Sequence, residues 1–102
     1  MKIGERIGAI LGSKKNGSVD FLGYGIYEGD EIPVNAVGQM AEMIREVGNL
    51  NPKLKLWDGS IVYGCECWWG PEEKVKTMLK DQVVNLVSIT KVREEYNKKH
   101  GN

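Results

Sequence analysis

The stretch that decides the fold class is Gly64-Cys65-Glu66-Cys67-Trp68-Trp69-Gly70-Pro71-Glu72-Glu73. Its first half predicts an extended strand, because aromatic residues are enriched in strands. Pro71 suits the first position of a helix, and the two glutamates that follow complement the positive end of a helix. A strand that passes directly into a helix predicts a domain that combines both elements.

Two hairpins are predicted upstream of this point. Asn16-Gly17 and Asp58-Gly59 are dipeptides that favour tight hairpin turns, since both accept positive φ. The first turn joins strands expected at residues 6–13 and 18–28, and the second joins strands expected at 53–57 and 60–69. With a two-residue turn, Leu11 pairs with Leu22 and Leu56 pairs with Ile61, so that each hairpin has one continuous apolar face.

The remaining segments complete the predicted topology. A helical pattern covers residues 36–47, with Asn35 as its N-cap and Gly48 just past its end. A second helix follows Pro71, and residues 83–89 predict a fifth strand. The resulting order is ββαββαβ, an α+β fold in which a mostly antiparallel five-stranded sheet carries two helices on one face. We expect one domain over residues 1–90 and a charged tail over 91–102 that begins as a short helix.

Composition limits the classes of function. The 102 residues include 14 basic and 14 acidic side chains, and the sequence has no excess of positive charge. Binding to a nucleic-acid polymer or to an anionic membrane usually requires such an excess, so we expect neither. No segment is apolar enough to span a bilayer, and the first residues lack the pattern of an export signal. Together with the two cysteines, this predicts a cytoplasmic protein with free thiols.

Cys65 and Cys67 invite a metal or redox interpretation that the spacing does not favour. On an extended strand, residues i and i+2 lie roughly 6.5–7 Å apart, at the limit for an unstrained disulfide. A structural zinc site needs about four ligands, and the sequence adds only His100. We therefore expect two thiols in the core, together with Trp69, and neither a metal nor a cofactor.

An open face is expected on the other side of the sheet. The strand alternation places four glycines on one face of the first hairpin (Gly8, Gly12, Gly23 and Gly25). It directs Glu66 and Trp68 to the same side as Lys55 and Trp57. Two large aromatic side chains on an uncovered face favour association, so we expect a homo-oligomer, most simply a dimer, that packs through this surface.

The expected function is that of a non-enzymatic binding protein. It would hold a small planar or anionic molecule, a nucleotide-like one included, for sequestration or sensing, and no catalytic residue is assigned. One alternative is a protein-interaction or assembly module that uses the same glycine and tryptophan face. Another is a small hydrolase that uses Glu66 and a second carboxylate. The residues expected to bind the ligand or partner are Arg6, Tyr27, Lys55, Trp57, Glu66 and Trp68.

Overall fold

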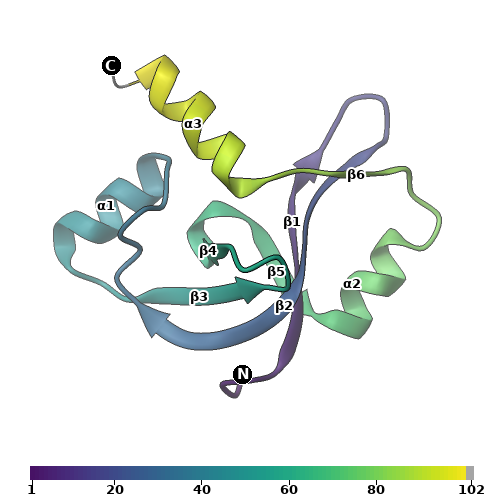
Figure 1. Ribbon diagram of the computed structural model, residues 1–102, viewed down its shortest axis with the longest axis horizontal. Coiled ribbons are helices and arrows are strands. Elements are labelled where there is room, and N and C mark those ends of the chain that lie inside the picture. Colours follow the sequence, from purple (N-terminus) through teal and green to yellow (C-terminus); the bar gives the residue numbers. More distant parts are fainter. Residues whose placement is uncertain (101–102) are drawn as a thin grey trace.

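The computed structural model describes residues 1–100 and confirms an α+β fold with an open, mostly antiparallel sheet. Strands β1 (Arg6–Ser13) and β2 (Val19–Glu31) form the first hairpin, and β3 (Asn51–Leu56) and β4 (Ile61–Tyr63) form the second. A 3₁₀ turn, η1 (Gly64–Glu66), separates β4 from β5 (Trp68–Pro71), and β6 (Val84–Leu86) is a short sixth strand. The order across the sheet is β4-β3-β2-β1-β5, and β6 pairs with β2 (Figure 1).

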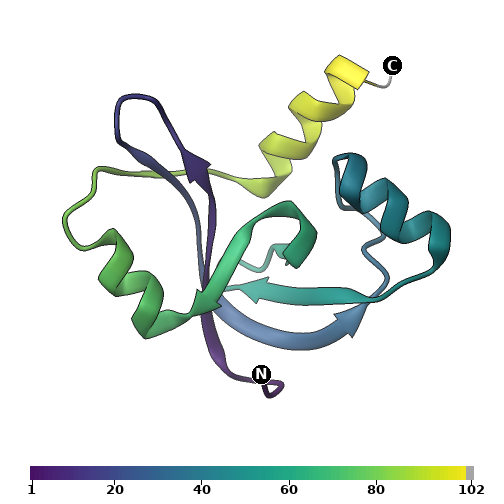
Figure 2. The same ribbon diagram turned by 180° about the vertical axis from the view of Figure 1, so that it is seen from behind.

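Three helices accompany the sheet: α1 (Gln39–Val47), α2 (Glu72–Leu79) and α3 (Ile89–His100). In both views, α1 and α2 lie at opposite ends of the molecule and α3 extends away from the sheet (Figure 1, Figure 2). Gly48 ends α1 in a left-handed conformation, as predicted, whereas the N-cap is Gly38 rather than Asn35. The predicted tail at 91–102 continues α3 as far as His100, and its last two residues lie outside the described part of the chain.

Both hairpins lie where the sequence predicted them, but the predicted register was wrong by one residue. Ile7 lies opposite Gly25 rather than Ile26, and Leu54 lies opposite Val62 rather than Tyr63. The reason is a three-residue loop in which the glycine takes positive φ, 87° at Gly17 and 91° at Gly59. This extra loop residue shifts the pairing of everything that follows.

The two loops are fixed by the same side-chain device. In the first, Asn16 Oδ1 accepts from the N–H and the hydroxyl of Ser18, at 3.0 and 2.7 Å. In the second, Asp58 Oδ1 accepts from the N–H and the hydroxyl of Ser60, at 2.8 and 2.6 Å. These bonds stabilise the third loop residue, which explains why both hairpins depart from the two-residue turn in the same way.

The main core lies on one side of the sheet. It is formed by side chains from four strands and by the first residue of α3, namely Ile7, Ala9, Leu22, Leu54, Leu56, Val62 and Ile89. Helices α1 and α2 pack on the other side, which agrees with two helices on one face. There Val75 of α2 contacts Ile10 and Phe21, and Ala41 of α1 packs near Tyr63.

The predicted glycine face does not form, because the register differs by one residue. Gly25 lies opposite Ile7, on the side of the main core, whereas Gly8 lies opposite Tyr24, on the side of α2. A Cβ placed on Gly8 would lie 2.7 Å from Val75 Cγ1, so α2 sits directly on this glycine. A Cβ on Gly25 would lie within 2.6 Å of Leu56 Cα, so β3 packs against that glycine. The absence of side chains allows the helix and the neighbouring strand to approach closely. These glycines therefore serve close packing on both sides of the sheet, and they form no broad glycine floor.

The second hairpin also departs from the predicted alternation. The strand expected over 60–69 is interrupted by η1, and β5 pairs with β1 instead of continuing beside β3. Because η1 breaks the period of two, Cys65 joins the cluster under α1, while Cys67 and Trp69 pack against the main core. For this reason, the alternation of side chains between the two faces of the sheet cannot be counted along the sequence beyond Tyr63.

Candidate ligand-binding site

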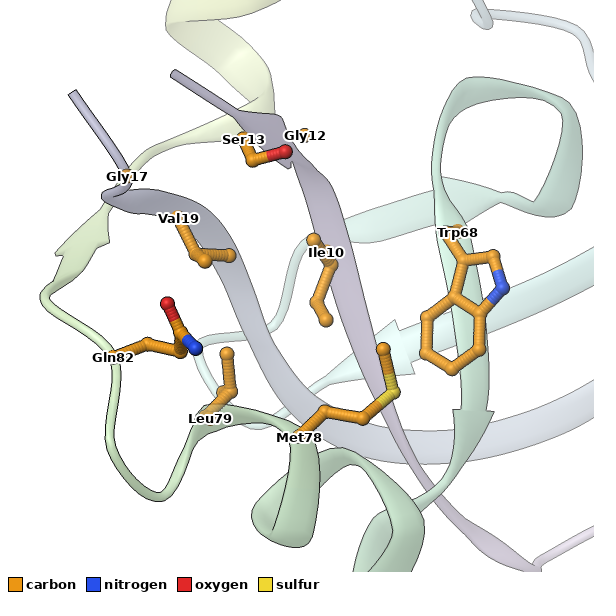
Figure 3. Close-up of a pocket in the computed structure, with 9 residues that line it drawn as sticks. All are labelled: Ile10, Gly12, Ser13, Gly17, Val19, Trp68, Met78, Leu79 and Gln82. Atoms are coloured by element: carbon orange, nitrogen blue, oxygen red, sulfur yellow. The ribbon is translucent and has the colours of Figure 1, made fainter. Parts of the chain in front are cut away.

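A hollow of about 440 Å³ opens on the side of the sheet that carries α2. Its walls come from β1, β2, β5 and α2, and it is mostly apolar (Figure 3). The lining residues are Ile10, Gly12, Ser13, Gly17, Val19, Trp68, Met78, Leu79 and Gln82. Its size and lining are typical of sites that take small molecules.

Strand pairing and helix packing together position the walls of this hollow. Ile10 lies opposite Trp68 in the antiparallel pair of β1 and β5. Val75 is fully buried over Gly8, which fixes α2 at short distance and brings Met78 and Leu79 of its last turn over the same strands. Figure 3 shows the end of the Met78 side chain beside the Trp68 ring and near Ile10.

Trp68 is the largest side chain in the hollow. It is 42% exposed, although its ring is held in place from below. A Cβ on Gly70 would lie 3.2 Å from the far edge of the indole, so the ring lies over this glycine. Lys74 Nζ lies 5.8 Å from the ring centroid, within range of a cation–π contact. The indole is thus both positioned and accessible.

The mouth of the hollow lacks side chains at two positions, Gly12 and Gly17. Gly17 needs its positive φ of 87° for the loop. Gly12 does not require a positive φ, and a Cβ built on it meets no atom within 4 Å. Every other glycine in residues 1–100 has either a positive φ or a neighbour within 3.4 Å of such a Cβ. Within residues 1–100, Gly12 is therefore the glycine for which neither backbone conformation nor close packing requires the absence of a side chain.

Two of the predicted site residues, Arg6 and Trp57, come together away from this hollow. The Arg6 guanidinium carbon lies 5.9 Å from the Trp57 ring centroid, and Arg6 Nε lies 3.3 Å from Glu72 Oε2. Trp57 is 59% exposed and lines a second hollow of about 380 Å³. The two exposed tryptophans therefore border different hollows, whereas we expected them on one surface.

Tyr27 and Lys55 occupy neighbouring strands and have different surroundings. The Tyr27 hydroxyl donates to Asp30 Oδ1 at 2.6 Å, and this bond raises the pKa of Tyr27. Its ring stacks on Trp69 with a centroid distance of 5.9 Å. Lys55 is exposed on β3, opposite Ile26 and Ile61. Neither residue lines the hollow beside Trp68.

Glu66 does not lie on an open face, and the orientation that we predicted for it was wrong. Its side chain is 1% exposed, and Arg93 Nη2 lies 2.7 Å from Oε1. The carboxylate also accepts from Arg93 Nε and from the backbone N–H groups of Val37 and Tyr63. The cause is η1, which turns the side chain at residue 66 inward, toward α3.

The two cysteines behave as packed thiols rather than as reactive groups. Both are free, and burial followed by the charge of Glu66 raises the pKa of each, that of Cys67 to about 12. Because the thiolate is the nucleophile and the metal ligand, a raised pKa works against both roles. Within residues 1–100, no three His, Cys, Asp or Glu side chains gather to hold a metal ion. In the same range, no helix is long and apolar enough to cross a membrane.

Of the residues that line the hollow, Trp68 was a predicted site residue and Gly12 belonged to the predicted glycine face, whereas the others were not expected at a site. Met78 and Leu79 looked like an ordinary apolar helix stripe, and Val75 of that stripe is indeed buried. Their joint exposure beside Trp68 follows from the pairing of β5 with β1, which depends on residues almost 60 positions apart. Ser13 and Gln82 carried no signal in the sequence.

Comparisons with known proteins leave the site to be judged on its geometry. No protein-family model matches the chain, and neither a curated protein nor a solved structure shows significant similarity to it. The shape and chemistry of the hollow beside Trp68 are therefore the evidence that bears on its function.

Proposed function

We propose that the protein is a non-enzymatic binding protein and that the hollow beside Trp68 holds a small planar molecule. The observation that carries this proposal is the accessible indole of Trp68, which faces Met78 across an apolar floor at Ile10 (Figure 3). A flat ring between an indole and a thioether gains area burial together with favourable aromatic and sulfur contacts.

The polar groups of the hollow favour a ligand with a hydrogen-bonding edge. The Ser13 hydroxyl and the Gln82 amide line it and supply both donors and acceptors. Among residues 1–100, no charged side chain lines the hollow, and Lys74 Nζ lies 5.8 Å from the centroid of the Trp68 ring. Of the planar and anionic ligands that the sequence suggested, the planar, uncharged kind suits this lining better. A neutral heteroaromatic ring meets these requirements.

Binding assays on matched variants test this proposal. A library of neutral heteroaromatic compounds is screened against the wild-type protein by ligand-observed NMR, and hits are retested on Trp68→Ala and Gly12→Leu. The first variant removes a wall, and the second fills the mouth at a position where a side chain has room. We expect Trp68→Ala to weaken binding by about tenfold or more, because one aromatic contact contributes about 1.5 kcal/mol. Gly12→Leu should weaken binding to a similar degree, because the leucine side chain would occupy the mouth of the hollow.

Trp57→Ala is the matched control, because it removes another exposed indole, one that borders a different hollow. Binding should persist in this variant. Equal loss of affinity in Trp57→Ala and Trp68→Ala, or no loss in either Trp68→Ala or Gly12→Leu, contradicts the assignment of the ligand to this hollow.

A protein-interaction or assembly module, acting as a homo-oligomer, is the second candidate. It is favoured by apolar side chains that remain exposed along α1 and just beyond it, at Met40, Met43, Val47 and Leu50. The glycine face cannot serve as the broad interface that we expected, since α2 covers Gly8. A dimer therefore requires another surface.

We favour a binding protein over the hydrolase alternative. Both oxygens of Glu66 accept hydrogen bonds and face the guanidinium of Arg93, so we do not assign it a catalytic role. The cytoplasm stays the proposed location because Cys65 and Cys67 are free thiols.

A further inference from the structure

Strand β6 has one bonded side and one open side. It pairs with β2 in parallel, and within residues 1–100 no strand pairs with its other side. Val19 N donates to Val83 O at 2.8 Å, and Val87 N donates to Phe21 O at 3.0 Å. Because alternate residues of a strand direct both backbone groups to the same side, those of Val84 and Leu86 point away from β2.

The open side of β6 is apolar and firmly held. Leu86 is 80% exposed and Val83 is 70% exposed. Between Val84 and Leu86, Asn85 directs its side chain inward, where Nδ2 donates to Ser18 Oγ at 3.1 Å and to Asp20 Oδ1 at 3.3 Å. The edge thus presents unpaired N–H and C=O groups in a fixed, extended geometry. Such an edge is a template for another strand.

Another edge of the sheet, at β4, is closed. Arg93 Nη2 donates to Ile61 O at 2.9 Å, and Glu66 Oε1 accepts from Tyr63 N at 3.0 Å. The ion pair thereby satisfies outward-facing groups that a neighbouring strand would otherwise satisfy. Since proteins protect exposed strand edges, an unprotected apolar edge in the same molecule indicates a surface that is covered by a partner.

We propose that this partner is a second copy of the chain, paired with β6 in antiparallel orientation about a two-fold axis at Asn85. In that register Val84 lies opposite Leu86 of the partner, and Leu86 lies opposite the partner's Val84. Each pair exchanges two backbone hydrogen bonds, so the edge is complementary to itself. The same pairing brings together the exposed apolar side chains of the two copies.

A three-residue strand is too short to form the whole interface. Specific interfaces bury about 800 Å² on each partner. The second hollow adjoins β6 and adds apolar surface, since it is lined by Leu22, Tyr24, Leu56, Trp57 and Leu86. Trp57, at 59% exposure, supplies an aromatic anchor of the kind that dominates interface energies. The predicted role of Trp57 in partner binding is consistent with this arrangement.

Sedimentation equilibrium over a range of concentrations tests the proposal, with light scattering as a second measure of mass. Wild-type protein should show a concentration-dependent dimer. Val84→Pro should be monomeric with an unchanged fold, because its N–H points outward and Pro is tolerated on a strand edge. Leu86→Lys should weaken the dimer by about tenfold or more without touching the backbone, since it places two like-charged side chains in an apolar interface.

Met43→Lys is the matched control, because it charges an apolar side chain of α1 that is 65% exposed and distant in sequence from β6. Its dimer should persist. Amide exchange supplies an independent readout: the N–H groups of Val84 and Leu86 should become protected as wild-type concentration rises. A wild-type monomer at all concentrations overturns the proposal, as does a dimer lost in Met43→Lys but kept in Leu86→Lys. The dimer does not depend on the ligand proposed for the Trp68 hollow, so the two proposals fail independently.

Discussion

Arg93 and Glu66 occupy the place that a neighbouring strand would take along the edge of β4. The two side chains are 2.7 Å apart, and each also binds a backbone group of β4 or its end. Arg93 belongs to α3 and Glu66 to η1, so the ion pair fastens the last helix to the second hairpin. The carboxylate further accepts from Val37 N, which ties the segment before α1 to the same point.

Removal of Arg93 should therefore destabilise the protein strongly. Arg93→Ala leaves the Glu66 carboxylate buried without a counter-charge, and the loss of one partner from a buried pair costs about 3–5 kcal/mol. Urea denaturation followed by circular dichroism measures the change. Arg6→Ala is the control, because its pair with Glu72 is 67% exposed on the arginine side and should contribute less than about 1 kcal/mol. Similar losses in the two variants would contradict the role assigned to the buried pair.

The contact between Gly8 and Val75 predicts a rescue experiment. Gly8→Ala should destabilise the fold by about 1–3 kcal/mol, because its Cβ would lie 2.7 Å from Val75 Cγ1. In the Gly8→Ala/Val75→Ala double variant the new methyl group gains room, so the combined loss should be smaller than the sum of the single losses. Gly12→Ala, with open space at its Cβ, should change stability by less than about 0.5 kcal/mol. Strict additivity would show that α2 does not rest on Gly8.

Cys67 predicts a loss of stability in alkaline solution. Burial raises the pKa of its thiol to about 12, whereas the unfolded thiol ionises near its ordinary value. The contribution of Cys67 to the free energy of unfolding is fully present below the pKa of the thiol in the unfolded chain. It is lost as the pH rises toward the pKa of the thiol in the folded protein. The stability difference between wild type and Cys67→Ala, measured by urea denaturation from pH 8 to pH 11, should shift in favour of the variant. A difference that is constant over this range would contradict a protected thiol.

Asp58 predicts a loss of stability in acidic solution. The Ser60 hydroxyl, and then the Ser60 N–H, lower the pKa of this carboxyl. Its contribution is present above the unfolded pKa, which is about 3.9, and is lost as pH falls through the folded pKa. Asn16 plays the same part in the first hairpin without a charge. Asp58→Asn should therefore keep the loop while removing this acid dependence, as urea denaturation between pH 6 and pH 3 would reveal. An identical acid profile in wild type and variant would count against it.

Local signals in the sequence predicted the elements but not their pairing partners. Asn16-Gly17 and Asp58-Gly59 located both hairpins, and Gly48 located the end of α1. The register was missed because the bonds from Ser18 and Ser60 that lengthen each loop are not evident from the dipeptide alone. The partner of Glu66 lies 27 residues away on a helix that we expected to be a short one, so its burial was beyond any strand alternation. The parallel pairing of β6 with β2 is likewise set by residues more than 60 positions apart.

The candidate site was predictable only in part for a related reason. Trp68 stood out as a large aromatic side chain at a strand end, and it does border a hollow. Ile10, Met78 and Leu79 are ordinary core residues by pattern, and they line a hollow only because α2 rests on Gly8. Closeness of two backbones at a glycine depends on the whole fold and leaves no local signature.

Two-dimensional NMR tests most directly whether the ligand binds in the Trp68 hollow. The protein is labelled uniformly with ¹⁵N and at its methyl groups, and it is titrated with a heteroaromatic hit. The three indole N–H signals, those of Trp57, Trp68 and Trp69, report on three separate places in the molecule. We expect the signals of the Trp68 indole and of the methyl groups of Ile10, Met78 and Leu79 to shift together with one dissociation constant. Shifts centred on Trp57, or hits that leave the Trp68 indole unmoved, would contradict it.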